Sequence, residues 1–100
     1  MGRRGVQSVS VRVMAAVWDR FDGNGGELLL ALALADFAAD DGTGIYPSVA
    51  RLARKTRRSR RAVQLGLRRL EALGFLSLVA EAGAGKATRQ YRISARWLEP

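Results

Sequence analysis

Apolar residues recur at helical spacing in three stretches that lie between turn-forming residues. The strongest is "ELLLALALADFAAD", residues 27–40, which is rich in Leu and Ala and apolar around most of its circumference. Glu27 lies in its first turn, where the helix dipole favours an anion. The following "DDGTG" ends the pattern, with Gly42 able to supply a left-handed cap. These features predict a central buried helix over residues 27–40.

Two shorter helices are predicted after this one, joined by a tight turn. Ser48 is a suitable N-cap for a helix over residues 49–55 that buries Val49, Leu52 and Ala53. Ser59 is a second N-cap, for a helix from Arg60 to about Leu73 that stops at Gly74.

The two ends of the chain give weaker patterns. In residues 8–21 the valines alternate as in a strand, but Val11, Met14 and Trp18 also share one helical face, and we favour a short helix over 11–20. Residues 75–95 predict a hairpin of two strands, 75–81 and 88–95, around a Gly-containing loop at 82–87. The inner face of this hairpin should carry Tyr91 and Ile93. Ile45-Tyr46 should be extended, because these residues precede Pro47. Trp97 should pack on the domain. The fold class is therefore mainly α with a small β-hairpin.

The charge is concentrated in one segment. The formal net charge is +8, yet residues 51–70, "RLARKTRRSRRAVQLGLRRL", carry nine basic residues and no acidic one. A mixed-charge surface that serves only solubility rarely has this composition. Such segregation indicates a face that binds a polyanion.

Helical phase separates this charge from the core. At about 100° per residue, Val63, Leu67 and Leu70 share one side of the helix 60–73, while Arg61, Leu65 and Arg68 lie roughly opposite and Gln64 lies on one flank. Two short helices joined by a tight turn make a helix-turn-helix, whose second helix enters the DNA major groove. For Leu65 two roles remain open, contact with a thymine methyl group or simple exposure.

The blocks "ALADFAADDGTGIYPSVARLAR", "SRRAVQLGLRRLEALGFL" and "TRQYRI" resemble the winged helix-turn-helix domain of phage and plasmid replication initiators and related accessory proteins. The resemblance covers about residues 26–94. It implies a three-helix core with a wing, double-stranded DNA as partner, a recognition helix at 60–73 and a wing at 82–89 that contacts the backbone or minor groove. We divide the chain into an N-terminal arm and short helix (1–25), the DNA-binding domain (26–96) and a tail (97–100).

The candidate DNA contacts fall on the two short helices, their turn and the wing. On the recognition helix and wing the assignments follow from the resemblance, and for the wing an ordinary hairpin loop is the alternative. The full set is Ser48, Arg51, Lys55, Arg57, Arg58, Ser59, Arg60, Arg61, Gln64, Leu65, Arg68, Lys86 and Arg89.

The sequence departs from the family pattern at the turn. Arg57 and Arg58 stand where that pattern has Gly and then an apolar residue. A non-Gly residue in a left-handed turn costs about 1 kcal/mol or more. For Arg58 we expect the aliphatic stem to lie on the core and the guanidinium to point toward DNA.

Other functions fit the composition less well. The chain has no Cys or His, so we expect no metal site, no cofactor, no small-molecule substrate and no enzyme activity. Its longest apolar run, Leu28–Ala35, is much shorter than the roughly 20 residues that span a membrane.

We expect a soluble protein of the prokaryotic cytoplasm or nucleoid, acting in replication initiation or transcription regulation. The alternative is a nonspecific nucleic-acid-binding accessory protein. The segment 8–21, rich in Val, Met and Trp, predicts packing on the domain and a contribution to a homodimer.

Overall fold

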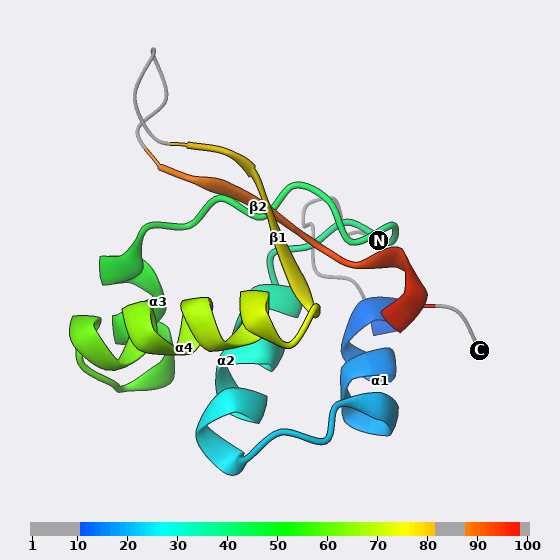
Figure 1. Cartoon of the computed structure of the whole chain (residues 1–100), viewed down its shortest axis with the longest axis horizontal. Coiled ribbons are helices and arrows are strands. Elements are labelled where there is room, and N and C mark those ends of the chain that lie inside the picture. Colours follow the sequence, from blue (N-terminus) through cyan, green and yellow to red (C-terminus); the bar gives the residue numbers. More distant parts are fainter. Residues whose placement is uncertain (1–10, 82–87, 99–100) are drawn as a thin grey trace, which may run out of the picture.

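The computed structural model describes residues 11–81 and 88–98 and has a helical body with a β-hairpin projecting from it (Figure 1). The elements follow one another as α1 (Val11–Arg20), α2 (Gly25–Ala35), α3 (Val49–Thr56), α4 (Arg60–Ala72), β1 (Leu76–Ala80), β2 (Gln90–Ile93) and the 3-10 helix η1 (Ala95–Trp97). This is a winged helix-turn-helix fold, with α2, α3 and α4 as its three-helix core, and it confirms the predicted fold class.

Helix α2 lies at the centre of the body, and its start is fixed by a capping box. The Asn24 side chain accepts a hydrogen bond from the Glu27 amide, and the Glu27 carboxylate accepts one from the Asn24 amide. These two bonds satisfy amides that the first turn of a helix leaves unpaired. The most deeply buried residues of α2 are Leu30, Ala31, Ala33, Leu34 and Ala35.

The predicted end of this helix, residue 40, was wrong. Helix α2 ends at Ala35, because the Phe37 and Ala38 amides bond to carbonyls only three residues back, which tightens the chain into a turn. Gly42 does adopt a left-handed conformation, with φ 83°, but it lies beyond this turn instead of capping the helix. Its carbonyl accepts a hydrogen bond from the Ile93 amide at 2.8 Å, so the turn docks on the hairpin.

Helices α3 and α4 confirm the two predicted short helices, with bounds that differ by one residue at their C-terminal ends. The Ser48 hydroxyl accepts a hydrogen bond from the Arg51 amide at 3.0 Å, and the Ser59 hydroxyl accepts one from the Ala62 amide at 3.0 Å. Gly74, with φ 81°, follows α4 as predicted.

The turn between α3 and α4 contains Arg57 in the left-handed region, at φ 57° and ψ 41°. It is the only non-glycine residue with a positive φ in segments 11–81 and 88–98. The departure from the family pattern therefore leaves the turn geometry intact and places an unfavourable backbone conformation on an arginine.

Arg57→Gly is expected to raise the free energy of unfolding by about 0.5–1 kcal/mol. Relief of the left-handed strain, about 1–2 kcal/mol, exceeds the extra unfolded-chain entropy of glycine. Urea unfolding would measure the change. Arg57→Ala is the matched control, because it removes the same charge and keeps the strain. If Arg57→Ala raises the free energy of unfolding by the same amount, the gain comes from the loss of charge repulsion and not from relief of the left-handed strain.

The hairpin is a two-stranded antiparallel sheet that pairs Leu76 with Ile93 and Leu78 with Tyr91. Both strands are shorter than predicted: β1 lacks the end residues 75 and 81, and β2 ends at Ile93, after which the chain turns into η1. A bulge between Leu78 and Ala80 interrupts the register within β1. The predicted loop at 82–87 lies outside the described residues.

The extended chain at Ile45 joins this hairpin as an isolated bridge. Ile45 and Tyr91 exchange backbone hydrogen bonds of 3.3 and 2.7 Å. The bridge fixes the wing to the loop that leads into α3. As predicted, Tyr91 and Ile93 are both buried.

The predicted N-terminal helix is confirmed as α1, which packs on α2 through the buried Val13 and Val17. The prediction for Trp97 is also confirmed. Its ring lies 5.4 Å from that of Phe75 and 5.9 Å from that of Phe21, centroid to centroid. This aromatic cluster connects α1, the start of β1 and η1.

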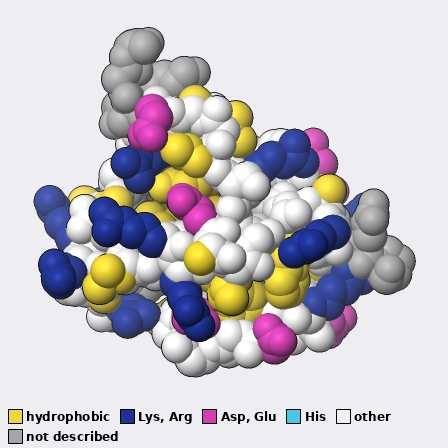
Figure 2. Space-filling view, in the orientation of Figure 1, with side chains coloured by type: hydrophobic (Ala, Val, Ile, Leu, Met, Phe, Trp, Pro, Cys, Tyr) yellow, Lys and Arg dark blue, Asp and Glu magenta, His cyan; other side chains and the backbone are white. Residues whose placement is uncertain are grey.

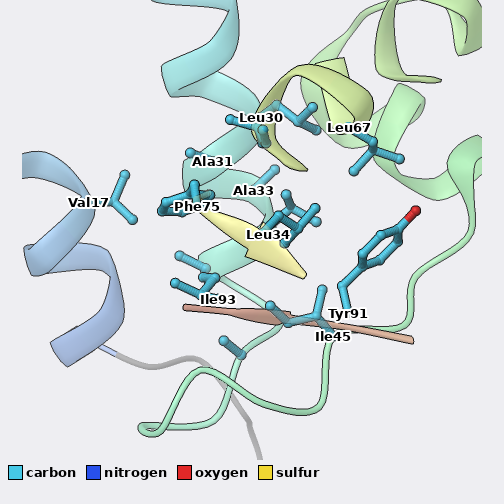
Figure 3. Packing of buried hydrophobic residues seen from close by; sticks show 14 of the residues in the cluster. Val17, Leu30, Ala31, Ala33, Leu34, Ile45, Leu67, Phe75, Tyr91 and Ile93 are labelled. Atoms are coloured by element: carbon cyan, nitrogen blue, oxygen red, sulfur yellow. The ribbon is translucent and has the colours of Figure 1, made fainter. Parts of the chain in front are cut away.

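The core gathers side chains from α1, α2, α4 and the hairpin around Phe75 and Leu34 (Figure 3). Helix α4 crosses α2 closely at Gly66, where an added Cβ would lie 2.7 Å from the Leu30 Cδ2 atom. A larger residue at this position would therefore push α4 away from α2.

Candidate nucleic-acid interface

Helix α4 has two faces of opposite character, as its helical phase predicts. Val63, Leu67 and Leu70 are buried against the core. The opposite face exposes four of the predicted contact residues, with Leu65 at 51% exposure among polar and basic neighbours. These are Arg61, Gln64, Leu65 and Arg68.

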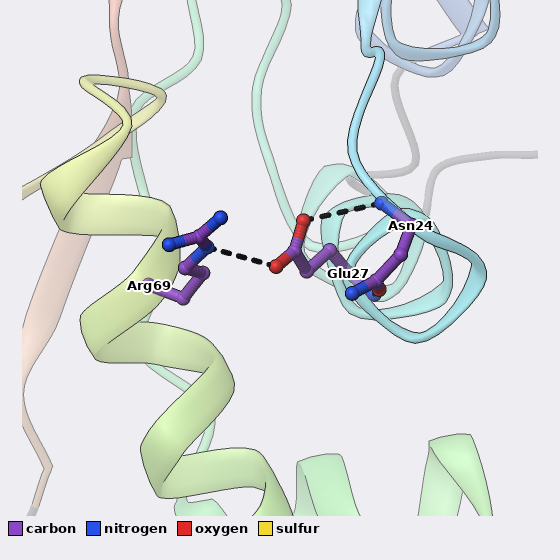
Figure 4. A network of polar contacts seen from close by, with 3 residues as sticks. All are labelled: Asn24, Glu27 and Arg69. Atoms are coloured by element: carbon purple, nitrogen blue, oxygen red, sulfur yellow. Dashed lines mark hydrogen bonds and ion pairs between the residues drawn. The ribbon is translucent and has the colours of Figure 1, made fainter.

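A polar network holds α4 against the start of α2 (Figure 4). The Arg69 Nε atom donates to the Glu27 carboxylate at 3.0 Å, and the same carboxylate accepts the capping hydrogen bond from the Asn24 amide. Arg69 thus holds α4 against α2 on the flank of α4 opposite Gln64. The Glu27 carboxylate partly neutralises the charge of the Arg69 guanidinium.

An open hollow of about 330 Å³ lies between α4, the start of α3 and the wing. It brings together four predicted contact residues from three parts of the chain: Ser48, Gln64, Arg68 and Arg89. Because Ser48 is the N-cap of α3, the hollow combines a hydroxyl, an amide and two guanidinium groups. Such groups match phosphate oxygens and base edges.

Among the other residues that line this hollow, two polar ones, Thr88 and Glu71, were missed by the sequence analysis. The Thr88 hydroxyl donates to the Tyr46 carbonyl at 2.6 Å, which ties the base of the wing to the loop before α3. Glu71 adds a carboxylate, and it could have been found from helical phase, since it lies seven residues after Gln64. Its negative charge disfavours phosphate at that end of α4 and marks a limit of the basic face.

On the wing, Arg89 is exposed and its Nε atom donates to the Glu81 carboxylate at 2.9 Å. A hydrogen bond with Tyr91, together with the negative charge of Glu81, raises the pKa of Arg89 above its ordinary value. Since an arginine is protonated at any physiological pH, Arg89 is a cation at the hollow. Lys86, the other predicted wing contact, lies outside the described residues.

Arg51 and Lys55 lie on a different side of α3 and do not line the hollow. The Arg51 guanidinium carbon lies 4.9 Å from the centre of the Phe37 ring, and the Lys55 ammonium lies 5.4 Å from it. Lys55 also forms an ion pair with Asp36, just after the end of α2. Of the predicted contacts on α3, Ser48 is thus the one that meets α4 and the wing.

The turn supplies the remaining predicted contacts. Ser59 caps α4, and Arg57, Arg58 and Arg60 are exposed around it. The Arg58 guanidinium lies beside Gly26 in the first turn of α2. Figure 2 shows Lys and Arg side chains around the end of the molecule where α3 and α4 lie. The turn therefore extends the basic face of α4 beyond its N-terminus.

Helix α4 has a basic face opposite a buried apolar stripe. It is preceded by the short helix α3 and followed by a wing, and this arrangement defines the class of helix-turn-helix domains. A family model described as a helix-turn-helix domain matches residues 24–76, from the α2 cap to the start of β1, and the chain belongs to this family. Family membership indicates DNA binding. Neither a search of curated proteins nor a search of solved structures finds a match.

Segments 11–81 and 88–98 offer neither a metal-ion site nor a membrane-spanning helix. Neither segment contains a cluster of acidic residues, Cys or His that could hold a metal ion. No helix within them is long and apolar enough to cross a membrane.

Proposed function

We propose that this chain binds double-stranded DNA in a sequence-selective manner, with α4 in the major groove and the wing on the neighbouring backbone or minor groove. The observation that carries the proposal is the exposed face of α4. It presents side chains that can recognise bases, while Val63, Leu67 and Leu70 on the opposite side are buried in the core. The hollow beside it offers cations for the phosphates that flank the groove.

Each exposed residue has a role that follows from its chemistry. The Arg61 guanidinium, in the first two turns of α4, can donate two hydrogen bonds to guanine O6 and N7. Gln64, one turn further along, can pair with adenine. Leu65 can meet a thymine methyl group, and Arg68 and Arg89 are expected to hold phosphates across the hollow.

Binding should weaken steeply as salt is added. If Arg57, Arg58, Arg60, Arg68 and Arg89 each neutralise one phosphate, log K against log salt should have a slope of about −4 to −5. Titration of a labelled duplex at several potassium chloride concentrations would measure it.

Two variants locate the charges responsible. Arg68→Gln should make the slope shallower by about 0.9, because one phosphate contact is lost. Lys55→Gln is the control and should leave the slope nearly unchanged, because Lys55 does not line the hollow beside α4 and its ammonium is paired with Asp36. An affinity that does not depend on salt would contradict the proposal.

The biological use we propose is replication initiation or transcription regulation of the phage and plasmid type, in the prokaryotic cytoplasm or nucleoid. Its support is the resemblance of the helix-turn-helix blocks and the "TRQYRI" strand to replication initiators. A nonspecific nucleic-acid-binding accessory protein would show the same salt dependence, but it would bind all duplex sequences with similar affinity.

A further inference from the structure

Helix α1 carries a second apolar surface besides the one packed on α2. Val11, Ala15 and Trp18 follow one another at helical spacing on the side opposite the buried Val13 and Val17. Val11 is 78% exposed and Trp18 is 62% exposed. A tryptophan this exposed presents a large apolar area to water on the outside of the domain.

This surface continues onto α2 through Met14, which is half-buried. Met14, Leu29 and Leu32 line an open hollow of about 420 Å³ between α1, α2 and the end of α3. Leu29 is itself 42% exposed. The stripe on α1 and the leucines of α2 together form an apolar face, which consists of Val11, Met14, Ala15, Trp18, Leu29 and Leu32.

The charged residues that flank Val11, Ala15 and Trp18 on α1 favour one particular binding partner for the apolar face. Arg12 and Asp19 are both exposed and lie on the same flank of α1, seven residues apart. If two copies of α1 cross in antiparallel orientation near Ala15, the two-fold axis places Arg12 of each copy beside Asp19 of the other. The small Ala15 side chain at the centre allows the two helices to approach closely.

We propose that the apolar face binds a second copy of this chain, in a two-fold symmetric homodimer built on antiparallel α1 helices. A helix of ten residues is only about 15 Å long. A stable interface needs roughly 1,000 Å² or more, so Leu29 and Leu32 of α2 must contribute beside the helix pair. The hollow within the face borders the end of α3 and the turn at Lys55, Thr56 and Arg57. Arg61 and Arg68 on α4 do not line it, so these two arginines lie outside the proposed interface.

Sedimentation equilibrium of the full chain without DNA tests the assembly, independently of the proposed function. The wild type should form a dimer, and Trp18→Glu should raise the dimer dissociation constant by about 30-fold or more, because a central tryptophan often dominates an interface. Val79→Glu is the control, since Val79 is 54% exposed on β1 and lies outside the apolar face. A wild type that stays monomeric at high micromolar concentration overturns the proposal.

A charge exchange tests the antiparallel arrangement. Asp19→Arg should weaken the dimer, because it places a second guanidinium opposite Arg12 of the other copy. Adding Arg12→Glu should restore dimerisation, since the pair is then present with its signs reversed. Circular dichroism verifies that each variant is folded, which matters for Arg12 because it also borders Asp40 and Asp41. If the double variant is folded but does not dimerise, the antiparallel arrangement is wrong. If Trp18→Glu dimerises with wild-type affinity, the apolar face is not the dimer interface.

Discussion

Replacing Arg61 with alanine is expected to weaken binding to the preferred duplex by about 1–3 kcal/mol, or roughly 5- to 150-fold in affinity. The side chain is exposed near the N-terminus of α4, on the face opposite Val63 and Leu67. This is the part of a recognition helix that meets base edges. The loss should be smaller on a scrambled duplex, where the arginine has no matching guanine. Fluorescence anisotropy with both duplexes would measure the two losses.

Arg96→Ala provides the control for net charge. Arg96 is also exposed, but it lies on η1 beside α1, away from the N-terminal end of α4 (Figure 1). It should change both affinities slightly and equally. If Arg61→Ala loses the same affinity on both duplexes, Arg61 contacts phosphate and does not read a base.

Phe75→Ala is expected to lower the free energy of unfolding by about 3–5 kcal/mol. Phe75 is fully buried, and its ring makes edge-to-face contacts with Phe21 at 5.3 Å and with Trp97 at 5.4 Å. The substitution leaves a cavity where α1, the hairpin and η1 meet. Since small domains are stable by only about 5–15 kcal/mol, the variant should be close to unfolding at room temperature.

Urea denaturation followed by circular dichroism would measure this loss. Val79→Ala is the matched control, because Val79 is exposed on the same hairpin and should cost about 0.5 kcal/mol or less. A loss below about 1 kcal/mol for Phe75→Ala would show that the aromatic cluster does not hold these elements together.

The local features of the fold were predictable from the sequence. Helical phase placed Val63 and Leu67 in the core and Arg61 on the exposed face, and the structure confirms each position. Ser48 and Ser59 were predicted as N-caps, and both accept the expected hydrogen bonds. Such features depend on residues three or four positions apart, which a single sequence displays directly.

Features that depend on distant residues were not predictable in the same way. The end of α2 is set by a turn that docks on the hairpin, and the run of Leu and Ala does not reveal it. Lys55 belonged to the basic run, and its pairing with Asp36 emerges only when α2 and α3 are packed together. The hydrogen bond of Thr88 with the Tyr46 carbonyl spans 42 positions, so the base of the wing could not be placed beside α3.

Selection of bound DNA from a random duplex pool tests the central claim most directly, that the exposed face of α4 reads base sequence. The wild type should enrich a defined motif, and Arg61→Ala should lose the preference at one position of that motif while the others remain. Enrichment of an inverted repeat would further agree with the proposed homodimer. If the wild-type pool stays random while salt-sensitive binding persists, the chain binds nucleic acid without sequence selectivity, and the role assigned to α4 is wrong.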